Sequence, residues 1–138
     1  MARSKPTTKI RVRFAETDQM GVAHHSSYAV WLEAARIEWL RERVISYAEI
    51  ERSGTSLAVA GLNICYRRAA AFDDLIAIWV SLDEVLSRRM TFSYILEGAD
   101  GLLLATAQTL HIPTDRSGRA TRLPEVWRNR LRSHVNNA

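Results

Sequence analysis

Apolar and polar residues alternate along several stretches of the chain, and this period of two is typical of half-buried β-strands. The first such stretch is Lys9–Phe14, in which Ile10, Val12 and Phe14 share one face. Four consecutive strands are predicted in the second half of the chain, at residues 57–66, 76–82, 90–96 and 102–112.

Three local signals refine these later strands. The alternation changes parity near Gly61, which predicts a β-bulge there. Gly98–Gly101 predicts a tight hairpin turn, and Pro113 is expected to end the last strand because proline lacks the N–H that a strand donates.

A different pattern follows the first strand. Between Tyr28 and Ile37 only Glu33 and Arg36 are charged, which predicts a helix that is apolar on nearly all sides. We expect this helix to run to about Arg43, with Ser26 or Ser27 as its cap, and to be covered all round by a sheet.

Two shorter helices are predicted beyond it. Tyr47–Arg52 forms a helical piece that ends at Gly54, and a C-terminal helix begins near Pro124, with Trp127, Leu131 and Val135 spaced four apart. The order of strand, long helix and four strands predicts an α+β fold in which an antiparallel sheet wraps one helix.

The length of 138 residues and the 47% hydrophobic and 25% charged fractions are those of one globular domain, with residues 1–7 expected to be disordered. No apolar run approaches a membrane span, no signal peptide is visible, and the single cysteine, Cys65, suits a reducing compartment. We therefore expect a cytoplasmic protein. The net charge of +4 alone leaves the partner undecided, but no nucleic-acid motif accompanies the arginines.

The loop before the long helix carries the candidate chemistry. It brings Asp18, His24 and His25 to the helix N-terminus, where unpaired N–H groups and the dipole favour negative charge. From spacing alone, the better interpretation of Asp18 is a loop acid that forms an Asx-turn before Gly21. No further ligand set supports a zinc site at the histidine pair or a nucleophilic role for Cys65, so no metal is predicted.

The pattern T-D-x-x-G-x-x-x-H-x-x-Y, formed by Thr17, Asp18, Gly21, His25 and Tyr28, resembles the signature of the 4-hydroxybenzoyl-CoA thioesterase family, including its Tol–Pal-associated branch. Several later motifs fit the same family and follow in the expected order over residues 8 to 131. They are Glu33-x-x-Arg36, Tyr66 followed by Phe72-Asp73-Asp74, and Gly118-Arg119 followed by Arg122-Leu123-Pro124. Ala69 departs from the pattern, since many members have proline there, and His24 stands where an aromatic residue is common.

The resemblance implies a hot-dog fold of about five strands around one central helix, and hydrolysis of an acyl- or aroyl-CoA thioester without a cofactor. It makes Asp18 the general base or nucleophile and places the backbone N–H of His25 at the thioester oxygen. It also implies a substrate site that includes Gly21 and Tyr28, with the long helix lining the acyl pocket.

For each of two pairs of residues, the sequence leaves two roles open. Glu33 and Arg36 lie three apart on the helix, so they form a mutual ion pair, or Glu33 lies near the acyl group. Arg88 and Arg89 bind the CoA phosphates or belong to a solvated turn.

A homodimer or homotetramer is expected, since one sheet leaves edge strands to cover. The alternative functions are a hot-dog dehydratase acting on acyl carrier protein and a non-catalytic acyl-CoA binding protein.

Overall fold

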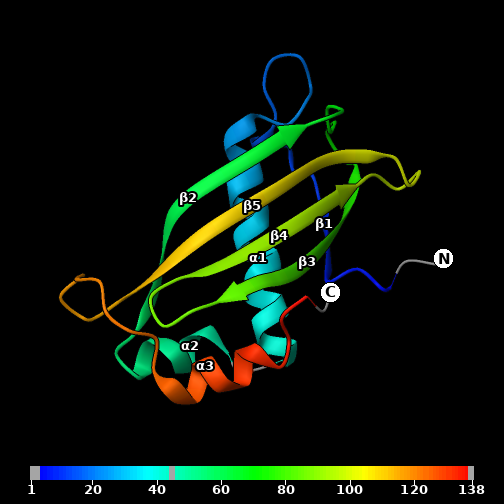
Figure 1. The fold of residues 1–138 in the computed structure, drawn as a ribbon. Coiled ribbons are helices and arrows are strands. Elements are labelled where there is room, and N and C mark those ends of the chain that lie inside the picture. The colour runs from blue at the N-terminus through cyan, green and yellow to red at the C-terminus, as the bar shows by residue number, and fades with distance from the viewer. Residues whose placement is uncertain (1–3, 44–45, 137–138) are drawn as a thin grey trace.

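A five-stranded antiparallel sheet and one long helix make up the fold (Figure 1). The computed structural model describes residues 4–43 and 46–136. In chain order the elements are β1 (Thr8–Arg11), η1 (Phe14–Glu16), α1 (His25–Arg43), α2 (Tyr47–Arg52), β2 (Ser56–Tyr66), β3 (Leu75–Val85), β4 (Met90–Glu97), β5 (Leu103–Thr114) and α3 (Glu125–Arg132). The strand order is β1-β3-β4-β5-β2, and every neighbouring pair is antiparallel. The predicted α+β class, an antiparallel sheet packed on one long helix, is confirmed.

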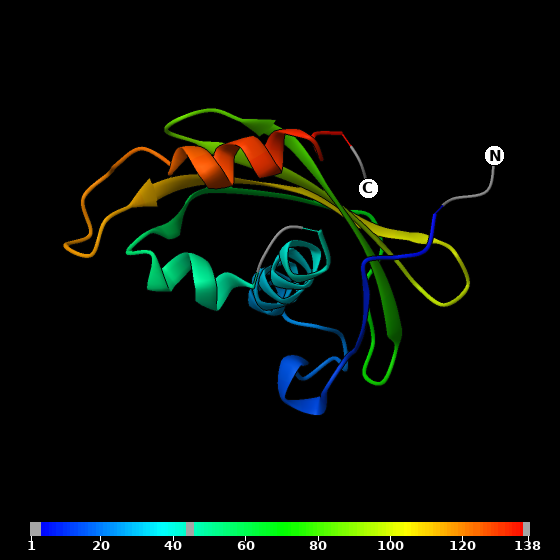
Figure 2. The same cartoon turned by 90° about the horizontal axis from the view of Figure 1, so that it is seen from below.

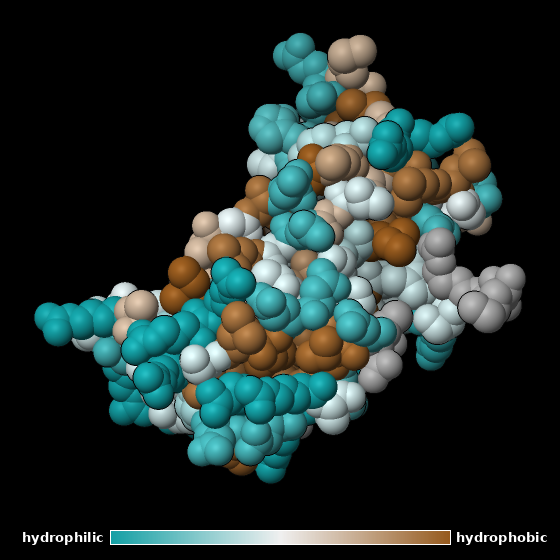
Figure 3. Space-filling model, viewed as in Figure 1, coloured by the Kyte–Doolittle hydropathy of each residue, from teal (hydrophilic) through white to brown (hydrophobic). Residues whose placement is uncertain are grey.

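The core lies between the inner face of the sheet and α1. Every second residue of the central strands points inward and is fully buried, as the alternation predicted. These residues are Ile76, Ile78, Val80, Leu82, Met90, Phe92, Tyr94 and Leu96. Opposite them α1 buries Trp31, Leu32, Ala35 and Trp39. The outer face of the sheet, seen in Figure 3, mixes apolar and polar side chains.

One side of α1 is open, so the expectation that the helix is covered all round is wrong for the chain as described. Figure 2 looks along α1 and shows the sheet curving over one side of it only. On the other side Glu33 and Ala34 are exposed, and 56% of Val30 is exposed. Only Glu33 and Arg36 are charged between Tyr28 and Ile37, so this part of the helix leaves apolar surface uncovered when a single sheet packs against it.

Several predicted boundaries are confirmed. The bulge in β2 falls between Val59 and Gly61, and Gly101 closes the β4–β5 turn by donating to the Gly98 carbonyl. The helical piece Tyr47–Arg52 and Gly54, with a left-handed φ of +92°, also lie where predicted.

Three predicted boundaries are wrong. Phe14 is 77% exposed because β1 ends at Arg11 and the chain turns into η1. Pro113 does not end β5, which continues to Thr114 with Pro113 paired opposite Leu57. Val135 lies beyond α3, where it forms a bridge with Leu82.

The start of the chain is held against the sheet. Within the stretch predicted to be disordered, residues 1–3 lie outside the described residues. Residues 4–7 are ordered, since the Ser4 carbonyl accepts from the Trp79 indole and the Thr7 N–H donates to the Ile78 carbonyl. Among the described residues, no helix is both long and apolar enough to cross a membrane.

Candidate active site

The turn that carries Asp18 lies between η1 and α1 and is closed by its own hydrogen bonds. The Asp18 N–H donates to the Val22 carbonyl at 2.9 Å, and the Gly21 N–H donates to the Asp18 carbonyl at 3.1 Å. Gly21 has a φ of +78°, a left-handed conformation that favours glycine. Asp18 Oδ1 accepts from the Met20 N–H at 2.8 Å, so the predicted Asx-turn is present. The carboxylate is nevertheless exposed and open to a substrate.

The helix that follows is capped by a histidine. His24 Nδ1 accepts from the Ser26 N–H at 3.2 Å, and the His24 carbonyl accepts from the Ser27 N–H at 2.9 Å. The expectation that Ser26 or Ser27 is the cap is therefore wrong. In the described part of the chain the backbone N–H of His25, the first residue of α1, donates to no acceptor. This N–H is available to a substrate oxygen at the positive end of the helix dipole.

A cavity of about 300 Å³ opens beside this helix N-terminus. It is lined by Ala23, His25, Tyr28, Tyr66, Arg67, Arg68 and Ala69. Tyr28 is buried and meets the half-exposed Tyr66 edge to face, with ring centroids 5.0 Å apart. Burial raises the pKa of Tyr28, although a backbone contact with Ala70 opposes the shift, so the phenol is neutral at physiological pH. The cavity thus has an aromatic wall and two cations at its rim.

The structure brings together only part of the predicted site. His25 and Tyr28 line the cavity, whereas Asp18 and Gly21 lie in the adjoining turn and are not among its lining residues. Glu33 lies two turns further along α1, exposed on the open side of the helix.

The ion pair predicted between Glu33 and Arg36 is wrong. Arg36 instead donates from Nη1 to the Tyr94 hydroxyl at 3.1 Å. Within the described ranges no ion pair joins the two helical residues.

Arg88 and Arg89 lie far from the cavity within one chain. They connect β3 to β4 at the end of the sheet where α1 finishes, whereas the cavity lies where α1 begins (Figure 1). Arg89 donates from Nε to Glu84 at 3.1 Å, and Arg88 is exposed.

The sequence interpretation assigned no role to the two arginines that line the cavity. Arg67 and Arg68 follow directly after Tyr66, at the point where β2 ends beside the start of α1. Their position directly after Tyr66, a residue of the family motif, could have indicated that they lie at the site. Cys65 is exposed and pairs opposite Thr106, away from the cavity lining. Among the described residues no group of His, Cys, Asp and Glu side chains is arranged to hold a metal ion.

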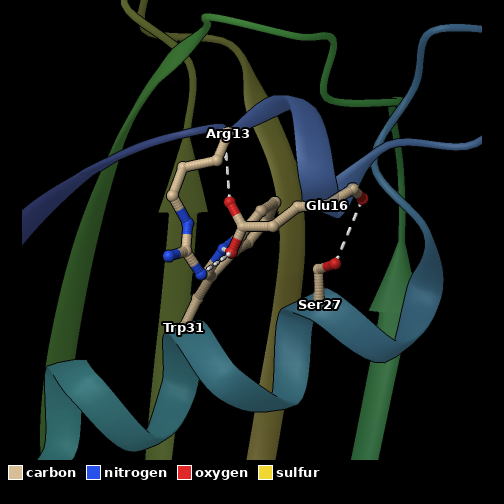
Figure 4. Close-up of polar contacts among 4 residues, drawn as sticks. All are labelled: Arg13, Glu16, Ser27 and Trp31. Carbon is tan, nitrogen blue, oxygen red and sulfur yellow. Dashed lines mark hydrogen bonds and ion pairs between the residues drawn. The ribbon is translucent and has the colours of Figure 1, made fainter.

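Glu16 is a further residue that the sequence interpretation missed. Its buried carboxylate lies between Arg13 and the indole of Trp31 on α1 (Figure 4). Burial raises the pKa of Glu16, but hydrogen bonds from the Arg13 backbone, the Trp31 indole and the Arg13 guanidinium outweigh it and hold the pKa below its ordinary value. Glu16 is therefore ionised at neutral pH. A single acid without a periodic pattern gave no signal for this role.

Comparison with known proteins places this geometry in a family. The family profile described as "Thioesterase-like superfamily" matches residues 12–131. The acyl-CoA thioester hydrolase YbgC of Escherichia coli O6:H1 is 27% identical over 106 residues, which cover 77% of this chain and 79% of that protein.

Two solved structures extend the comparison. The hypothetical protein TT1821 of Thermus thermophilus is 40% identical, with a TM-score of 0.87 over 92% of this chain and 97% of that one. The DHNA-CoA thioesterase of Staphylococcus aureus is 28% identical, with the same TM-score over 91% of this chain and 87% of that one. The two named enzymes hydrolyse thioesters, and neither is a dehydratase.

Proposed function

The chain belongs to the Thioesterase-like superfamily and is an acyl-CoA thioester hydrolase, and from this premise we propose that Asp18 and the backbone of His25 carry its chemistry. The observation that supports the assignment is the pairing of an exposed carboxylate with a free N–H at the N-terminus of α1. Thioester hydrolysis needs both a base or nucleophile and a donor for the oxyanion.

Asp18 acts by one of two balanced routes. As a general base it removes a proton from water, the oxygen of that water adds to the carbonyl, and the CoA thiolate leaves with the proton. As a nucleophile it attacks the carbonyl and expels the thiolate, and water then hydrolyses the resulting anhydride. In both routes the His25 N–H stabilises the oxyanion, and the products are the free acid and CoA.

The cavity beside His25 receives the acyl group. Tyr28 and Tyr66 offer ring edges and faces against which an aromatic acyl group would stack. The DHNA-CoA named for the Staphylococcus aureus relative is an aromatic thioester, which supports an aroyl substrate here. In this proposal Gly21 belongs to the substrate site, because its left-handed backbone gives the turn beside the substrate its shape.

A homodimer completes the site in this proposal, and two dimers would form a tetramer. β2 is an edge strand, and its exposed apolar side chains Val59, Leu62 and Tyr66 lie on the same side of the sheet as the open face of α1 around Val30. Antiparallel pairing of two β2 edges would cover these side chains. It would also place the far end of one sheet beside the cavity of the other, so that Arg88 and Arg89 of a second copy approach the CoA and Glu33 lies near the acyl group. A mass by light scattering that corresponds to an active monomer would rule this out.

Replacement of the proposed base is the direct test. Asp18→Asn keeps the shape of the side chain and its Asx-turn but removes the charge, so kcat should fall at least about 100-fold. KM and the melting temperature should change little. His25→Ala keeps the backbone donor and serves as the control, with a much smaller loss. If Asp18→Asn folds normally and retains more than about a tenth of the wild-type kcat, the proposed chemistry is wrong.

A further inference from the structure

Glu16 is a buried ionised side chain that the proposed chemistry does not use, although it precedes Asp18 by two residues. We propose that Glu16 is a positioning residue that fixes the Asp18 turn relative to the His25 N–H. This inference rests on the proposed function, because it concerns the geometry between those two groups.

The carboxylate of Glu16 joins η1 to the central helix. Oε1 accepts from the Arg13 N–H at 2.8 Å, and Oε2 accepts from the Trp31 indole at 2.9 Å and the Arg13 guanidinium at 3.3 Å. Both oxygens are thus engaged by donors on different elements, which leaves the carboxylate one orientation (Figure 4). Trp31 is itself 1% exposed and packs on Tyr28 of the cavity, with ring centroids 4.7 Å apart.

The backbone of the same residue closes the loop that follows. The Glu16 carbonyl accepts from the His24 N–H at 2.8 Å and from the Ser27 hydroxyl at 3.1 Å. His24 is the residue before the proposed oxyanion donor, and the isolated bridge between Thr17 and Ala23 lies just inside this closure. Glu16 therefore holds both ends of the loop that carries Asp18. Its side chain decides where its backbone lies against α1.

The requirement for a carboxylate follows from the donors around it. The Arg13 N–H and the Trp31 indole both donate, and a buried position needs an acceptor for each. In Glu16→Gln the amide nitrogen must face one of these two donors, which removes a hydrogen bond and opposes two N–H groups. The loop must then move, and a displacement of about 1 Å at a reacting group can reduce the rate about 100-fold.

Steady-state kinetics of Glu16→Gln with an acyl-CoA that the wild type hydrolyses will test the proposal. We expect kcat to fall at least about tenfold while KM stays within about twofold, since substrate contacts remain and only the reacting geometry changes. Trp31→Phe removes the opposed donor. In the double variant Glu16→Gln, Trp31→Phe the amide nitrogen faces only the Arg13 guanidinium, whose side chain is 71% exposed and can turn away, so part of the lost kcat should return.

A stability control separates positioning from folding. Leu131→Ala truncates a buried side chain on α3, at the opposite end of the molecule, and should lower the melting temperature without changing kcat. If Glu16→Gln lowers the melting temperature but keeps the wild-type kcat, as Leu131→Ala does, the positioning role is overturned. If Glu16→Gln does not fold, Trp31→Phe alone decides: a lower kcat at unchanged KM supports the role, and an unchanged kcat refutes it.

Failure of this inference and failure of the proposed function give different results. An inactive Asp18→Asn together with a fully active Glu16→Gln removes only the positioning role. An active Asp18→Asn removes the proposed chemistry itself, whatever Glu16→Gln does.

Discussion

Two buried titratable groups that differ in charge are linked to α1, Glu16 directly through Trp31 and His111 through Thr109 and Tyr94 to Arg36. Glu16 is 8% exposed, and His111 on β5 is fully buried. The pKa values of both are below their ordinary values, yet the result is opposite: Glu16 is ionised and His111 is neutral at physiological pH.

The difference comes from the partners of each group. Glu16 has three donors directed at its carboxylate, whereas His111 Nε2 lies 2.8 Å from the Thr109 hydroxyl, which in turn lies 2.6 Å from the Tyr94 hydroxyl. Burial, and to a smaller extent the charge of Arg36, lower the pKa of His111 to about 4, although the Leu57 carbonyl opposes the shift. A buried carboxylate whose oxygens each accept from a donor is held in one orientation. The neutral hydrogen-bonded row of His111, Thr109 and Tyr94, which lies beside packed aromatic rings, mainly fills space. Of the two groups, the charged one lies at the end that carries the proposed chemistry.

The largest expected effect is a pH dependence of stability caused by His111. Below its unfolded pKa of 6.5 the unfolded chain binds a proton that the folded protein refuses, so stability falls as the pH decreases from 6.5 to about 4. The shift corresponds to about 3 kcal/mol in the free energy of unfolding. Urea denaturation between pH 7 and pH 4.7, above the range in which Glu16 loses its own contribution, should show about 2 kcal/mol of this loss, since each pH unit below 6.5 contributes about 1.36 kcal/mol.

His111→Gln is the control for that measurement. It keeps a hydrogen-bonding side chain but does not titrate, so its free energy of unfolding should stay nearly constant over the same range. An equal slope in the variant and the wild type would assign the effect to other groups.

The next prediction tests whether the neutral hydrogen-bonded row of His111, Thr109 and Tyr94 contributes to stability without contributing to catalysis. Tyr94→Phe removes the hydroxyl that accepts from Arg36 and contacts Thr109, leaving buried polar groups unsatisfied. We expect a loss of about 1–3 kcal/mol in the free energy of unfolding, with kcat unchanged. Thr106→Val, on the outer face of β5, should cost much less. A large loss of kcat in Tyr94→Phe would contradict the separation.

Replacing one pair of arginines at each end of the sheet tests which end binds the CoA phosphates. If Arg88 and Arg89 meet the CoA phosphates, replacing both with alanine should raise KM up to about thirtyfold and weaken its salt dependence while sparing kcat, because each exposed ion pair contributes about 0.2–1 kcal/mol. The same replacement of Arg67 and Arg68 tests the rim of the cavity. An unchanged KM in the Arg88/Arg89 variant assigns that pair to the solvated surface.

The smallest effect concerns the exposed partner of Glu16. Arg13→Gln removes a guanidinium whose side chain is 71% exposed but leaves the backbone N–H of residue 13 and the Trp31 indole in place. The free energy of unfolding should fall by less than about 1 kcal/mol. A loss as large as that of Glu16→Gln would show that the ion pair, rather than the hydrogen bonds, holds the carboxylate.

The strands and helices were predictable because their signal is periodic. The alternation from Ile76 to Leu82 and from Met90 to Leu96 gave two central strands, and the change of parity gave the bulge near Gly61. Errors arose where neighbours in space decide the outcome. Pro113 stays in β5 although proline often ends a strand.

The candidate site was predictable only as far as its motif extends. His25 and Tyr28 share the cavity, as the resemblance implied, but Glu16 contacts Trp31 fifteen positions away, and no sequence period marks that pair. The open side of α1 was missed for another reason. The apolar surface of a helix predicts that it is buried, but it does not predict whether the same chain or a second copy buries it.

That open side has a consequence for how the enzyme behaves on dilution. If a second copy covers the exposed strip of Val30, Val59, Leu62 and Tyr66, the folded state is linked to protein concentration by mass action. The unfolding midpoint will then rise with concentration, and specific activity will fall when the enzyme is diluted below the dissociation constant of the dimer. A tandem fusion of two copies through a flexible linker would replace that dependence with a fixed effective concentration, and its activity would no longer change with dilution.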